Sequence, residues 1–312
     1  MRALHAYARN DPSRLVYEED VPSPTLDPGD VLIRVHASGV TPSELEWSGK
    51  WVDRAGTPRT PPIIPGHEVA GVVGAAGPDV EHLAVGDAVY GFIDSRRDGA
   101  DAEYVAVRAT ELAPKPATLT FTEAAAVPLS ALTAWQALFD HGDLQVGQRV
   151  LIHGGAGGVG SFAVQLGRWR GAYVVATASA RDAELVRDLG AVEVIDYRAR
   201  RFEEVVADMD LVFDTVGGET WERSWGVLRP DGRLVSIAVP RPPERETRDG
   251  RRTIWFVVEP NRAQLIDIAR LIDGGHLRPI VSAVIPLAEG RAAYGAGHNG
   301  RGPGKVVLLV AE

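Results

Sequence analysis

The chain of 312 residues contains no cysteine, and this absence excludes several kinds of chemistry at once. Without thiols the protein has no disulfide, no cysteine-ligated iron–sulfur cluster and no zinc site with thiolate ligands. A fold that does without disulfides suits a reducing cytoplasm, where we expect the protein to act. A chain of this length also buries a core large enough to be stable without covalent cross-links.

Positive charge is outnumbered by negative charge, and long apolar stretches are lacking as well. The formal net charge is −9, which disfavours binding to phosphate backbones, so we expect no nucleic-acid partner. No apolar run approaches the roughly 20 residues that a membrane-spanning helix needs. Residues 1–5 do not lead into the apolar core of a signal peptide. We therefore expect a soluble cytoplasmic protein with no membrane partner.

Glycine, in contrast, is plentiful, and one turn is built almost entirely from it. Residues 153–160 have the sequence HGGAGGVG and follow the apolar strand predicted at 150–152. Gly155, Gly157 and Gly160 fit the pattern G-x-G-x-x-G, in which glycines permit a tight turn and let the backbone approach a pyrophosphate. Free N–H groups at the start of the following helix favour an anion. The turn predicts a dinucleotide site, although glycine-rich turns also arise for steric reasons alone.

Short apolar strands alternate with amphipathic helices through the second half of the chain. This pattern is typical of a parallel sheet wrapped by crossover helices, so we predict the α/β class with a doubly wound parallel sheet. Residues 240–252 are charged and rich in proline, and we expect an exposed loop there between the last two strands. The six predicted strands span residues 150–152, 173–176, 192–195, 211–213, 234–237 and 254–258.

The first part of the chain has a different pattern. Residues 31–36 alternate between buried-type and exposed-type side chains, and Pro-Gly, Gly-Pro and Gly-Asp pairs separate further short strands, which favours a β-rich barrel. After Pro260 an apolar repeat predicts a helix that ends at Gly274, and residues 305–310 predict a closing strand that returns to the first domain. The predicted domains are residues 1–122 with 260–312, and residues 123–259.

Several segments, taken together and in order, resemble one enzyme family. They are PGHEVAGVV at residues 65–73, LTAWQAL at 132–138, the glycine turn, LGA at 189–191 followed by IDY at 195–197, DTVGG at 214–218 and GKVV at 304–307. With these motifs the chain resembles the medium-chain dehydrogenase/reductase superfamily, in its zinc-independent NADPH:quinone oxidoreductase-like branch, over essentially its whole length. The resemblance implies a β-rich GroES-like barrel as the catalytic domain, a Rossmann domain for the nucleotide, and a nicotinamide held between them.

The second predicted strand of the sheet bears on which nucleotide binds. An NAD site usually has an acidic residue about 20 positions after the first glycine, where it contacts the ribose 2′-hydroxyl. Here no carboxylate occurs until Asp182. A hydroxyl and a guanidinium suit a 2′-phosphate, so Ser179 and Arg181, with Tyr197 as the contact that the resemblance implies, predict NADP(H). Alternatively, Ser179 caps a helix and Arg181 is a solvated surface residue.

The resemblance supplies the remaining cofactor contacts, and each of these residues also has an ordinary structural explanation. In the turn it implies contacts from Gly155, Gly157, Gly158, Val159 and Gly160. It further implies Thr133 near the nicotinamide, Thr215 and Val216 after the fourth strand, Phe256 and Val258 at the carboxamide, and Lys305 near the cofactor phosphates.

The same resemblance bears on metal binding. Zinc-dependent relatives use a cysteine, the histidine of the Gly-His-Glu motif and a third ligand. This chain retains His67 and Glu68 but has Thr41 at the place of the cysteine. A site formed by His67, Glu44 and Glu68 is chemically allowed, because zinc accepts nitrogen and oxygen ligands. We nevertheless expect no metal and interpret His67 as a structural residue.

Loss of the metal favours certain substrates. Reduction of an isolated carbonyl develops a charge on oxygen that zinc normally stabilises, whereas a quinone or an α,β-unsaturated carbonyl delocalises that charge itself. We expect Thr41 and Ser43 to border the nicotinamide, with Ser43 as a hydrogen-bond donor; alternatively, Ser43 only caps a helix. Trp47 and Trp51 are candidates to stack on a flat substrate, unless they are core residues.

The leading hypothesis is therefore a metal-free, NADPH-dependent reductase of quinones or conjugated carbonyls. A second enzyme hypothesis is enoyl reduction on carrier-bound intermediates of polyketide-type synthesis. A third, from another class, is a nucleotide-binding sensor with little turnover. The resemblance also suggests a homodimer that pairs through the strand predicted at 254–258.

Overall fold

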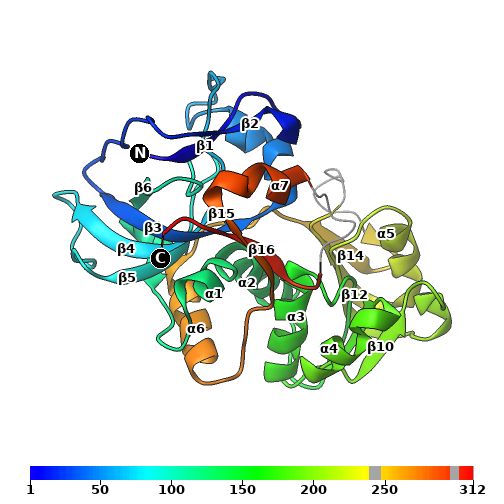
Figure 1. Cartoon of the computed structure of the whole chain (residues 1–312). Coiled ribbons are helices and arrows are strands. Elements are labelled where there is room, and N and C mark those ends of the chain that lie inside the picture. Colours follow the sequence, from blue (N-terminus) through cyan, green and yellow to red (C-terminus); the bar gives the residue numbers. More distant parts are fainter. Residues whose placement is uncertain (239–246, 296–301, 312) are drawn as a thin grey trace. The chain divides into compact units, whose positions relative to one another are not determined.

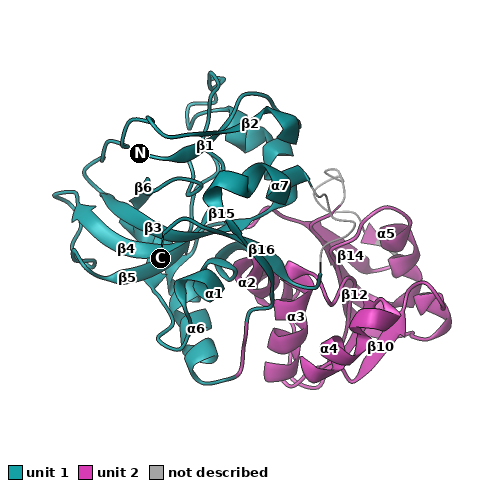
Figure 2. Cartoon of the chain, in the orientation of Figure 1, with its two compact units in different colours: residues 1–129, 259–275, 279–312 teal, residues 130–258, 276–278 magenta. Residues whose placement is uncertain are grey.

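The computed structural model describes residues 1–238, 247–295 and 302–311 (Figure 1). The chain divides into two compact units, coloured separately in Figure 2. Unit 1 comprises Met1–Leu129, Glu259–Gly275 and Pro279–Glu312, and unit 2 comprises Ser130–Val258 and His276–Arg278. Both ends of the chain therefore belong to unit 1, which the chain leaves and re-enters.

The main sheet of unit 1 is mostly antiparallel and has the order β15-β16-β3-β4-β5-β7, with β6 also paired to β3. No pairing among the described strands joins the two ends of this order into a closed barrel. The strands are β3 (Asp30–Val40), β4 (Glu68–Ala76), β5 (Ala88–Phe92), β6 (Tyr104–Arg108), β7 (Leu112–Pro114), β15 (Val281–Pro286) and β16 (Lys305–Leu309), and a separate pair consists of β1 (Ala3–Ala6) and β2 (Leu15–Glu18).

The long strand β3 organises this sheet. Val31, Ile33 and Val35 are fully buried, whereas Arg34 between them is exposed, which is the period-two pattern of a strand with one face on the core. The predicted closing strand is present as β16, which pairs antiparallel with the end of β3 through Val306 opposite Val40. Antiparallel pairing of β16 with β3 places Lys305 beside the residues that follow β3.

The helices of unit 1 are α1 (Phe121–Ala125), α6 (Arg262–Asp273) and α7 (Gly290–Gly295). Helix α6 begins after Asn261, whose side chain accepts the Gln264 N–H, and ends at Gly274, where the sequence predicts its end. The Tyr90 hydroxyl donates to the Leu265 carbonyl at 2.6 Å and so fixes α6 on the sheet. No helix in the described part of the chain is long and apolar enough to cross a membrane.

Unit 2 contains the predicted doubly wound sheet, in the order β10-β9-β8-β11-β12-β14-β13. All neighbouring strands are parallel except β13 and β14. The elements are β8 (Arg149–Ile152), β9 (Tyr173–Ala178), β10 (Glu193–Asp196), β11 (Met209–Asp214), β12 (Leu228–Ser236), β13 (Thr247–Arg248) and β14 (Arg251–Trp255), with helices α2 (Pro128–Trp135), α3 (Gly158–Trp169), α4 (Ala183–Asp188) and α5 (Glu219–Ser224). The α/β fold-class prediction is confirmed.

The prediction of a loop over 240–252 is wrong for its last residues. Residues 239–246 lie outside the described part, but Thr247–Arg248 pairs with Arg251 and Arg252 in a short hairpin. Asp249 and Gly250 at its tip both have positive φ, the conformation of a two-residue turn that matches strand twist. The charged composition concealed this Asp-Gly signal. Strand β14 also ends at Trp255, before Phe256 and Val258.

Candidate active site

The glycine turn of unit 2 leaves no room for side chains at two of its positions. A Cβ added at Gly155 would lie 2.9 Å from the Ala176 Cβ, and one added at Gly160 would lie 2.8 Å from the carbonyl carbon of Gly154. Real Cβ atoms do not approach so closely, so Gly155 lets the turn pack on β9, and Gly160 lets the first turn of α3 pack on the backbone of Gly154.

Neighbouring strands fix the turn through hydrogen bonds. The Gly154 N–H donates to the Thr177 hydroxyl at 3.1 Å, and the Thr215 hydroxyl donates to the His153 carbonyl at 2.7 Å. Burial lowers the pKa of His153 to about 4, so its imidazole is neutral near pH 7 and acts as a structural group. Thr215, which directly follows β11, therefore helps to hold the turn in shape.

The other end of the turn is open. Gly157 is exposed, and a Cβ there would meet only the Gly154 carbonyl oxygen, at 3.3 Å. It is the N-cap of α3 and provides no side-chain cap. The N–H groups of a helix's first turn have no acceptor within the helix, so this end presents donors to an anion. The geometry fits the pyrophosphate of a dinucleotide.

The three residues predicted to contact a 2′-phosphate lie after β9 and β10. Arg181 is 72% exposed, and Tyr197 is 57% exposed. The Ser179 hydroxyl donates to the Asp182 carboxylate at 2.7 Å, and the Arg181 Nε lies 3.2 Å from the same carboxylate. Ser179 is the N-cap of a short 3-10 helix but makes no capping bond. Asp182 therefore engages two of the three predicted phosphate contacts, which sequence reasoning did not foresee.

The remaining predicted contacts of unit 2 differ in exposure. Val216, just after β11, is exposed, and Val258 is half-buried. Thr133 is buried within α2, and Phe256 is buried with its ring 4.4 Å from that of His141. Val216 is thus accessible to a ligand as it stands, whereas Thr133 and Phe256 pack into the protein.

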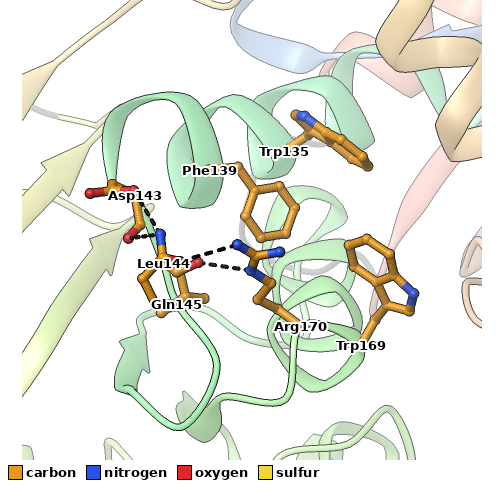
Figure 3. Close-up of a pocket in the computed structure, with 7 residues that line it drawn as sticks. All are labelled: Trp135, Phe139, Asp143, Leu144, Gln145, Trp169 and Arg170. Carbon is orange, nitrogen blue, oxygen red and sulfur yellow. Dashed lines mark hydrogen bonds between the residues drawn. The ribbon is translucent and has the colours of Figure 1, made fainter.

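A small cavity of about 210 Å³ in unit 2 is lined by none of the predicted residues (Figure 3). The Trp135 and Trp169 rings stack at 6.2 Å, and Phe139 lies edge-on to Trp135 at 5.1 Å. The Arg170 guanidinium bonds the Leu144 carbonyl at 3.0 Å. The cavity is therefore bounded by packed aromatic rings from α2, the π-helix Gln136–His141 that continues it, and α3.

In unit 1 the predicted catalytic residues lie just beyond β3. Thr41 is the N-cap of a short 3-10 helix, Pro42–Glu46, but its side chain makes no capping bond. Ser43 lies inside this helix, so it is not the cap that the alternative interpretation required. The Trp47 ring stacks on His67 at 5.7 Å, and the Trp51 indole donates to the Leu45 carbonyl at 2.9 Å. Both tryptophans are half-buried.

His67 is buried, and neither ring nitrogen has a hydrogen-bond partner in the described structure. Burial lowers the pKa of His67 well below its usual value, so the imidazole is neutral. Among the described residues no three histidine, aspartate or glutamate side chains are grouped to hold a metal ion. The alternative ligand set of His67, Glu44 and Glu68 therefore does not come together in this structure.

Lys305 lies at a place that neither periodicity nor spacing revealed. Its ammonium donates to the Thr41 hydroxyl at 2.9 Å and forms an ion pair with the Glu68 carboxylate. The other Glu68 oxygen accepts the Leu129 N–H at 3.0 Å. Lys305 thus contacts one of the two predicted catalytic residues directly. Its predicted contact with the cofactor phosphates stays a prediction.

A second buried polar cluster fixes the loop that carries Ser43. The Glu44 carboxylate accepts the Gly66 N–H at 2.6 Å and lies 2.8 Å from the Tyr294 hydroxyl, which lies 2.7 Å from Asp101. Because Tyr294 has one hydroxyl hydrogen for two carboxyl groups, one of these carboxyl groups carries a proton. Burial raises the pKa of Glu44 to about 7 and raises that of Asp101.

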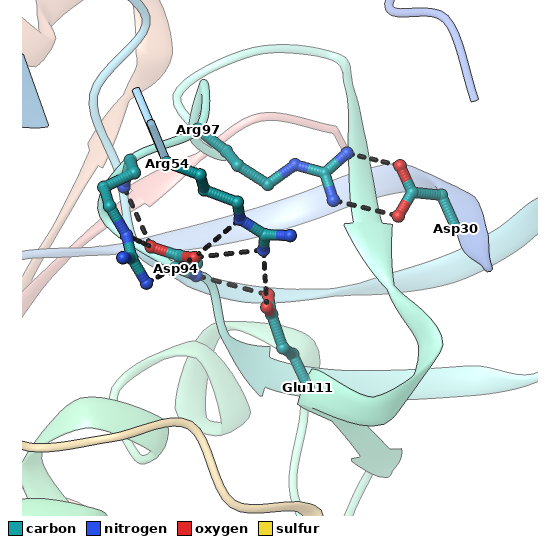
Figure 4. Close-up of polar contacts among 6 residues, drawn as sticks. Asp30, Arg54, Asp94, Arg97 and Glu111 are labelled. Atoms are coloured by element: carbon teal, nitrogen blue, oxygen red, sulfur yellow. Dashed lines mark hydrogen bonds and ion pairs between the residues drawn. The ribbon is translucent and has the colours of Figure 1, made fainter. Parts of the chain in front are cut away.

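A further charged cluster lies after β5 (Figure 4). Arg54 forms ion pairs with Asp94 at 3.0 Å and Glu111 at 3.7 Å, and Arg97 pairs with Asp30. Burial raises the pKa of Glu111 to about 7. These contacts connect the segment after β5 to β3 and to the residues before β7, so they stabilise unit 1 at a distance in sequence from the predicted catalytic residues.

Two family models match the chain. The model described as alcohol dehydrogenase GroES-like domain matches residues 27–117, within unit 1. The model described as zinc-binding dehydrogenase matches residues 189–308. These residues include most strands of the unit 2 sheet and the later part of the chain that belongs to unit 1.

Relatives and solved structures match the chain along its length. NAD(P)H oxidoreductase RTN4IP1, mitochondrial, of Danio rerio is 31% identical and covers 99% of this chain and 90% of its own. The 2-methylene-furan-3-one reductase of Solanum lycopersicum is 34% identical, covering 94% of this chain and 75% of its own. The quinone oxidoreductase structure from Coxiella burnetii superimposes with a TM-score of 0.89 at 29% identity, over 100% of this chain and 99% of that chain. The chain belongs to the medium-chain dehydrogenase/reductase superfamily, and it is an oxidoreductase.

Proposed function

We propose that the protein is a zinc-independent, NADPH-dependent oxidoreductase that reduces a quinone or an α,β-unsaturated carbonyl. The observation that carries the proposal is the turn at residues 153–160, tightly packed at Gly155 and Gly160 and open at Gly157. Bound there, NADPH supplies a hydride from C4 of its nicotinamide. The turn residues Gly155, Gly157, Gly158, Val159 and Gly160 would hold its pyrophosphate.

Preference for NADPH over NADH is supported at the end of β9. The place of the usual acidic residue is occupied by small residues up to Ser179, and the exposed guanidinium of Arg181 follows. A 2′-phosphate would compete with Asp182 for both side chains, and it offers more charge and more acceptor oxygens than one carboxylate. Tyr197 is exposed beside them and is the third proposed contact.

The substrate class is supported by the groups near Thr41. An ammonium 2.9 Å from the Thr41 oxygen disfavours a divalent cation at the same place, because like charges repel. Without a Lewis acid, a substrate that delocalises the charge left by hydride addition is reduced most readily. Two of the similar proteins are named a quinone oxidoreductase and a 2-methylene-furan-3-one reductase, and the latter name denotes a conjugated carbonyl.

Within unit 1, Thr41 and Ser43 are the proposed hydrogen-bond donors to the substrate. They follow β3 at two half-buried positions separated by Pro42, and the Glu44 contacts fix the loop between them and Trp47. Trp47 and Trp51 are proposed to border a flat substrate. The part of each ring that is not buried is what a substrate would contact.

One experiment separates this proposal from its two alternatives. Purified, chelator-treated protein is mixed with NADPH and a panel of quinones, enones and a thioester enoyl substrate, and NADPH absorbance is followed. Oxidation of NADPH by a quinone or an enone is expected. Turnover of the enoyl thioester alone would favour the carrier-linked reductase. Binding of NADPH without turnover of any member would favour a sensor, and loss of turnover on chelation would contradict metal independence.

A homodimer and a cytoplasmic location remain predictions. The edge predicted to pair between subunits is partly covered, because β13 pairs with Arg251 and Arg252 of β14; among the described residues no strand pairs with Thr253–Trp255 on that side. Mass measurement in solution tests the dimer. The Danio rerio relative carries "mitochondrial" in its name, so fractionation of the source cells is the test for location.

A further inference from the structure

Strand register brings three polar side chains to one face at the end of β3. Val306 of β16 lies opposite Val40, so Lys305 is next to Thr41. Strand β16 thus lies on one side of β3 (Figure 1). On its other side, Glu68 of β4 lies opposite Gly39. Positions 39 and 41 are two residues apart in an extended segment, so they face the same side of the sheet, as do Glu68 and Lys305 opposite them.

Gly39 allows the Glu68 carboxylate to reach across β3. A Cβ at Gly39 would lie 3.0 Å from both the Glu68 Cβ and its Oε2 atom, so any larger residue would push this side chain away. Through the space that glycine leaves, Glu68 forms its ion pair with Lys305. The side chains of Glu68 and Lys305 are only 1% and 8% exposed. The pair is therefore held in a desolvated place, where each charge depends on the other.

The chemistry of Lys305 and Thr41 determines which of them donates the hydrogen in their contact. An ammonium has three donors and no acceptor, so Thr41 must be the acceptor in its 2.9 Å contact with Lys305. The hydroxyl hydrogen of Thr41 then points elsewhere, and no acceptor within the described structure receives it. A hydroxyl that accepts from a cation is polarised and becomes a better donor. Nothing comparable orients the Ser43 hydroxyl among the described residues.

We propose that Lys305 is a positioning residue that fixes the Thr41 hydroxyl as the donor to the oxygen anion formed when the substrate is reduced. This inference rests on the proposed function, because it needs a substrate oxygen that gains charge. Thr41 would be the residue that touches that oxygen, and Lys305 would act through it. A donor already oriented before the reaction stabilises the anion without reorganisation when the charge appears.

The test uses variants that keep the buried charges balanced. Lys305→Met alone would leave the Glu68 charge unpaired, so it is combined with Glu68→Gln. Thr41→Val removes the hydroxyl at nearly constant shape, Thr41→Ser restores it, and Lys305→Arg restores the cation. Each protein is first checked by its melting temperature and by its Kd for NADPH.

Thr41→Val is expected to lower kcat about 100-fold, the usual cost of losing one donor to a developing oxyanion. The Kd for NADPH should change less than about 2-fold. Thr41→Ser, which keeps the hydroxyl, and Lys305→Arg, which keeps the cation, should each retain most of the wild-type kcat. The paired Lys305→Met and Glu68→Gln variant should also have a lower kcat, because the Thr41 hydroxyl loses the cation that orients it. Adding Thr41→Val to that pair should then cause little further loss, because the residues act as one unit.

A binding measurement separates failure of this inference from failure of the proposed function. The p-nitrophenolate anion, a stable mimic of a reduced substrate oxygen, is titrated into each variant and followed by its absorbance. The wild-type protein should bind it about 10-fold or more tightly than Thr41→Val does. If the wild-type protein reduces no quinone or enone, but both Thr41→Val and the paired Lys305→Met and Glu68→Gln variant bind the anion more weakly than it does, the proposed function fails, whereas Thr41 is still an anion donor that Lys305 orients.

Two outcomes overturn the inference itself. One is equal binding of p-nitrophenolate by the wild-type protein and Thr41→Val, which would show that the hydroxyl is not an anion donor. The other is a paired Lys305→Met and Glu68→Gln variant whose loss multiplies with that of Thr41→Val, or whose only change is a weaker Kd for NADPH. Lys305 would then act independently of Thr41, on the cofactor.

Discussion

The two candidate regions of this molecule are built in opposite ways. The turn of unit 2 consists of eight consecutive residues, 153–160, and presents backbone because side chains are nearly absent. The group in unit 1 consists of the hydroxyl of Thr41 and the buried charged side chains of Glu68 and Lys305. These residues come from three strand ends far apart in sequence. A site made of backbone is encoded locally, whereas a site made of side chains depends on strand register.

The largest effect should come from disturbing the packed end of the turn. Gly160→Ala places a Cβ against the Gly154 carbonyl group, and it should reduce NADPH affinity more than about 100-fold while also lowering the melting temperature. Gly157→Ala is the matched control, because its Cβ meets only one atom, at 3.3 Å. It should melt near the wild-type temperature yet bind NADPH about 10-fold more weakly, since the methyl group would stand between backbone and pyrophosphate.

Calorimetric titration of NADPH into both variants checks this pair. Wild-type affinity in Gly157→Ala would show that the open end of the turn does not receive the pyrophosphate. Equal losses of melting temperature in both variants would remove the distinction between the packed end and the open end.

The next effect concerns the buried carboxyl groups of unit 1. Burial raises the pKa of Glu44 from 4.5 to about 7. Between these two pH values Glu44 therefore holds a proton in the folded state but not in the unfolded state. Its contribution to stability is therefore fully present below pH 4.5 and is lost as the pH rises toward 7, by up to about 3 kcal/mol. Glu44→Gln should flatten this part of the curve, measured by denaturant unfolding at several pH values.

Glu111 is the matched control for Glu44. Its pKa is also raised by burial to about 7, but it contacts Asp94 and Arg54 instead of the loop that carries Ser43. Glu111→Gln should flatten the stability curve in the same pH window without moving the pH profile of kcat. A Glu44→Gln variant whose unfolding free energy keeps the wild-type slope between pH 4.5 and 7 would contradict the protonated carboxyl group in this cluster.

A smaller effect is expected at the end of β9. Arg181→Ala should raise the Kd for NADPH about 10-fold and leave that for NADH unchanged, because only the 2′-phosphate uses the guanidinium. Fluorescence titration of both nucleotides gives the two values. An unchanged NADPH value, or equal losses for both nucleotides, would show that Arg181 does not recognise the phosphate.

The smallest effect is expected for the neighbouring carboxylate. Asp182→Asn removes a negative charge that contacts both Ser179 and Arg181, so it should tighten NADPH binding about 2- to 4-fold, as expected for an exposed pair. The gain should diminish in high salt. Weaker NADPH binding would mean that Asp182 instead orients these side chains for the phosphate.

The sequence predicted the parts of the fold that depend on local signals. Six of the seven described strands of unit 2, the turn at 153–160 and the end of α6 at Gly274 each have a periodicity or a glycine that marks them, although β14 ends before the predicted residue 258. The Asp249-Gly250 hairpin also had a local signal, but the proline and charge around it favoured a loop.

The contacts of unit 1 had no such local signal. Lys305 contacts Thr41 because β16 pairs with β3 in one register, and a shift by one residue would turn Lys305 to the other face. The contact between Glu44 and Tyr294 likewise joins residues 250 positions apart. No pattern along the chain distinguishes these residues from solvated charges, since only the folded strands determine which of them become buried together.

The most direct test of the account is to follow the transferred hydrogen. Chelator-treated protein is supplied with an α,β-unsaturated ketone and, in separate reactions, with NADPH carrying deuterium in each of the two C4 positions, and the product is analysed by NMR. The account predicts that one of the two labels delivers a single deuterium to the β-carbon, and that chelator treatment does not lower the rate measured with unlabelled NADPH. Product without deuterium at that carbon from either label, or a reaction that stops on chelation and resumes with added zinc, would contradict it.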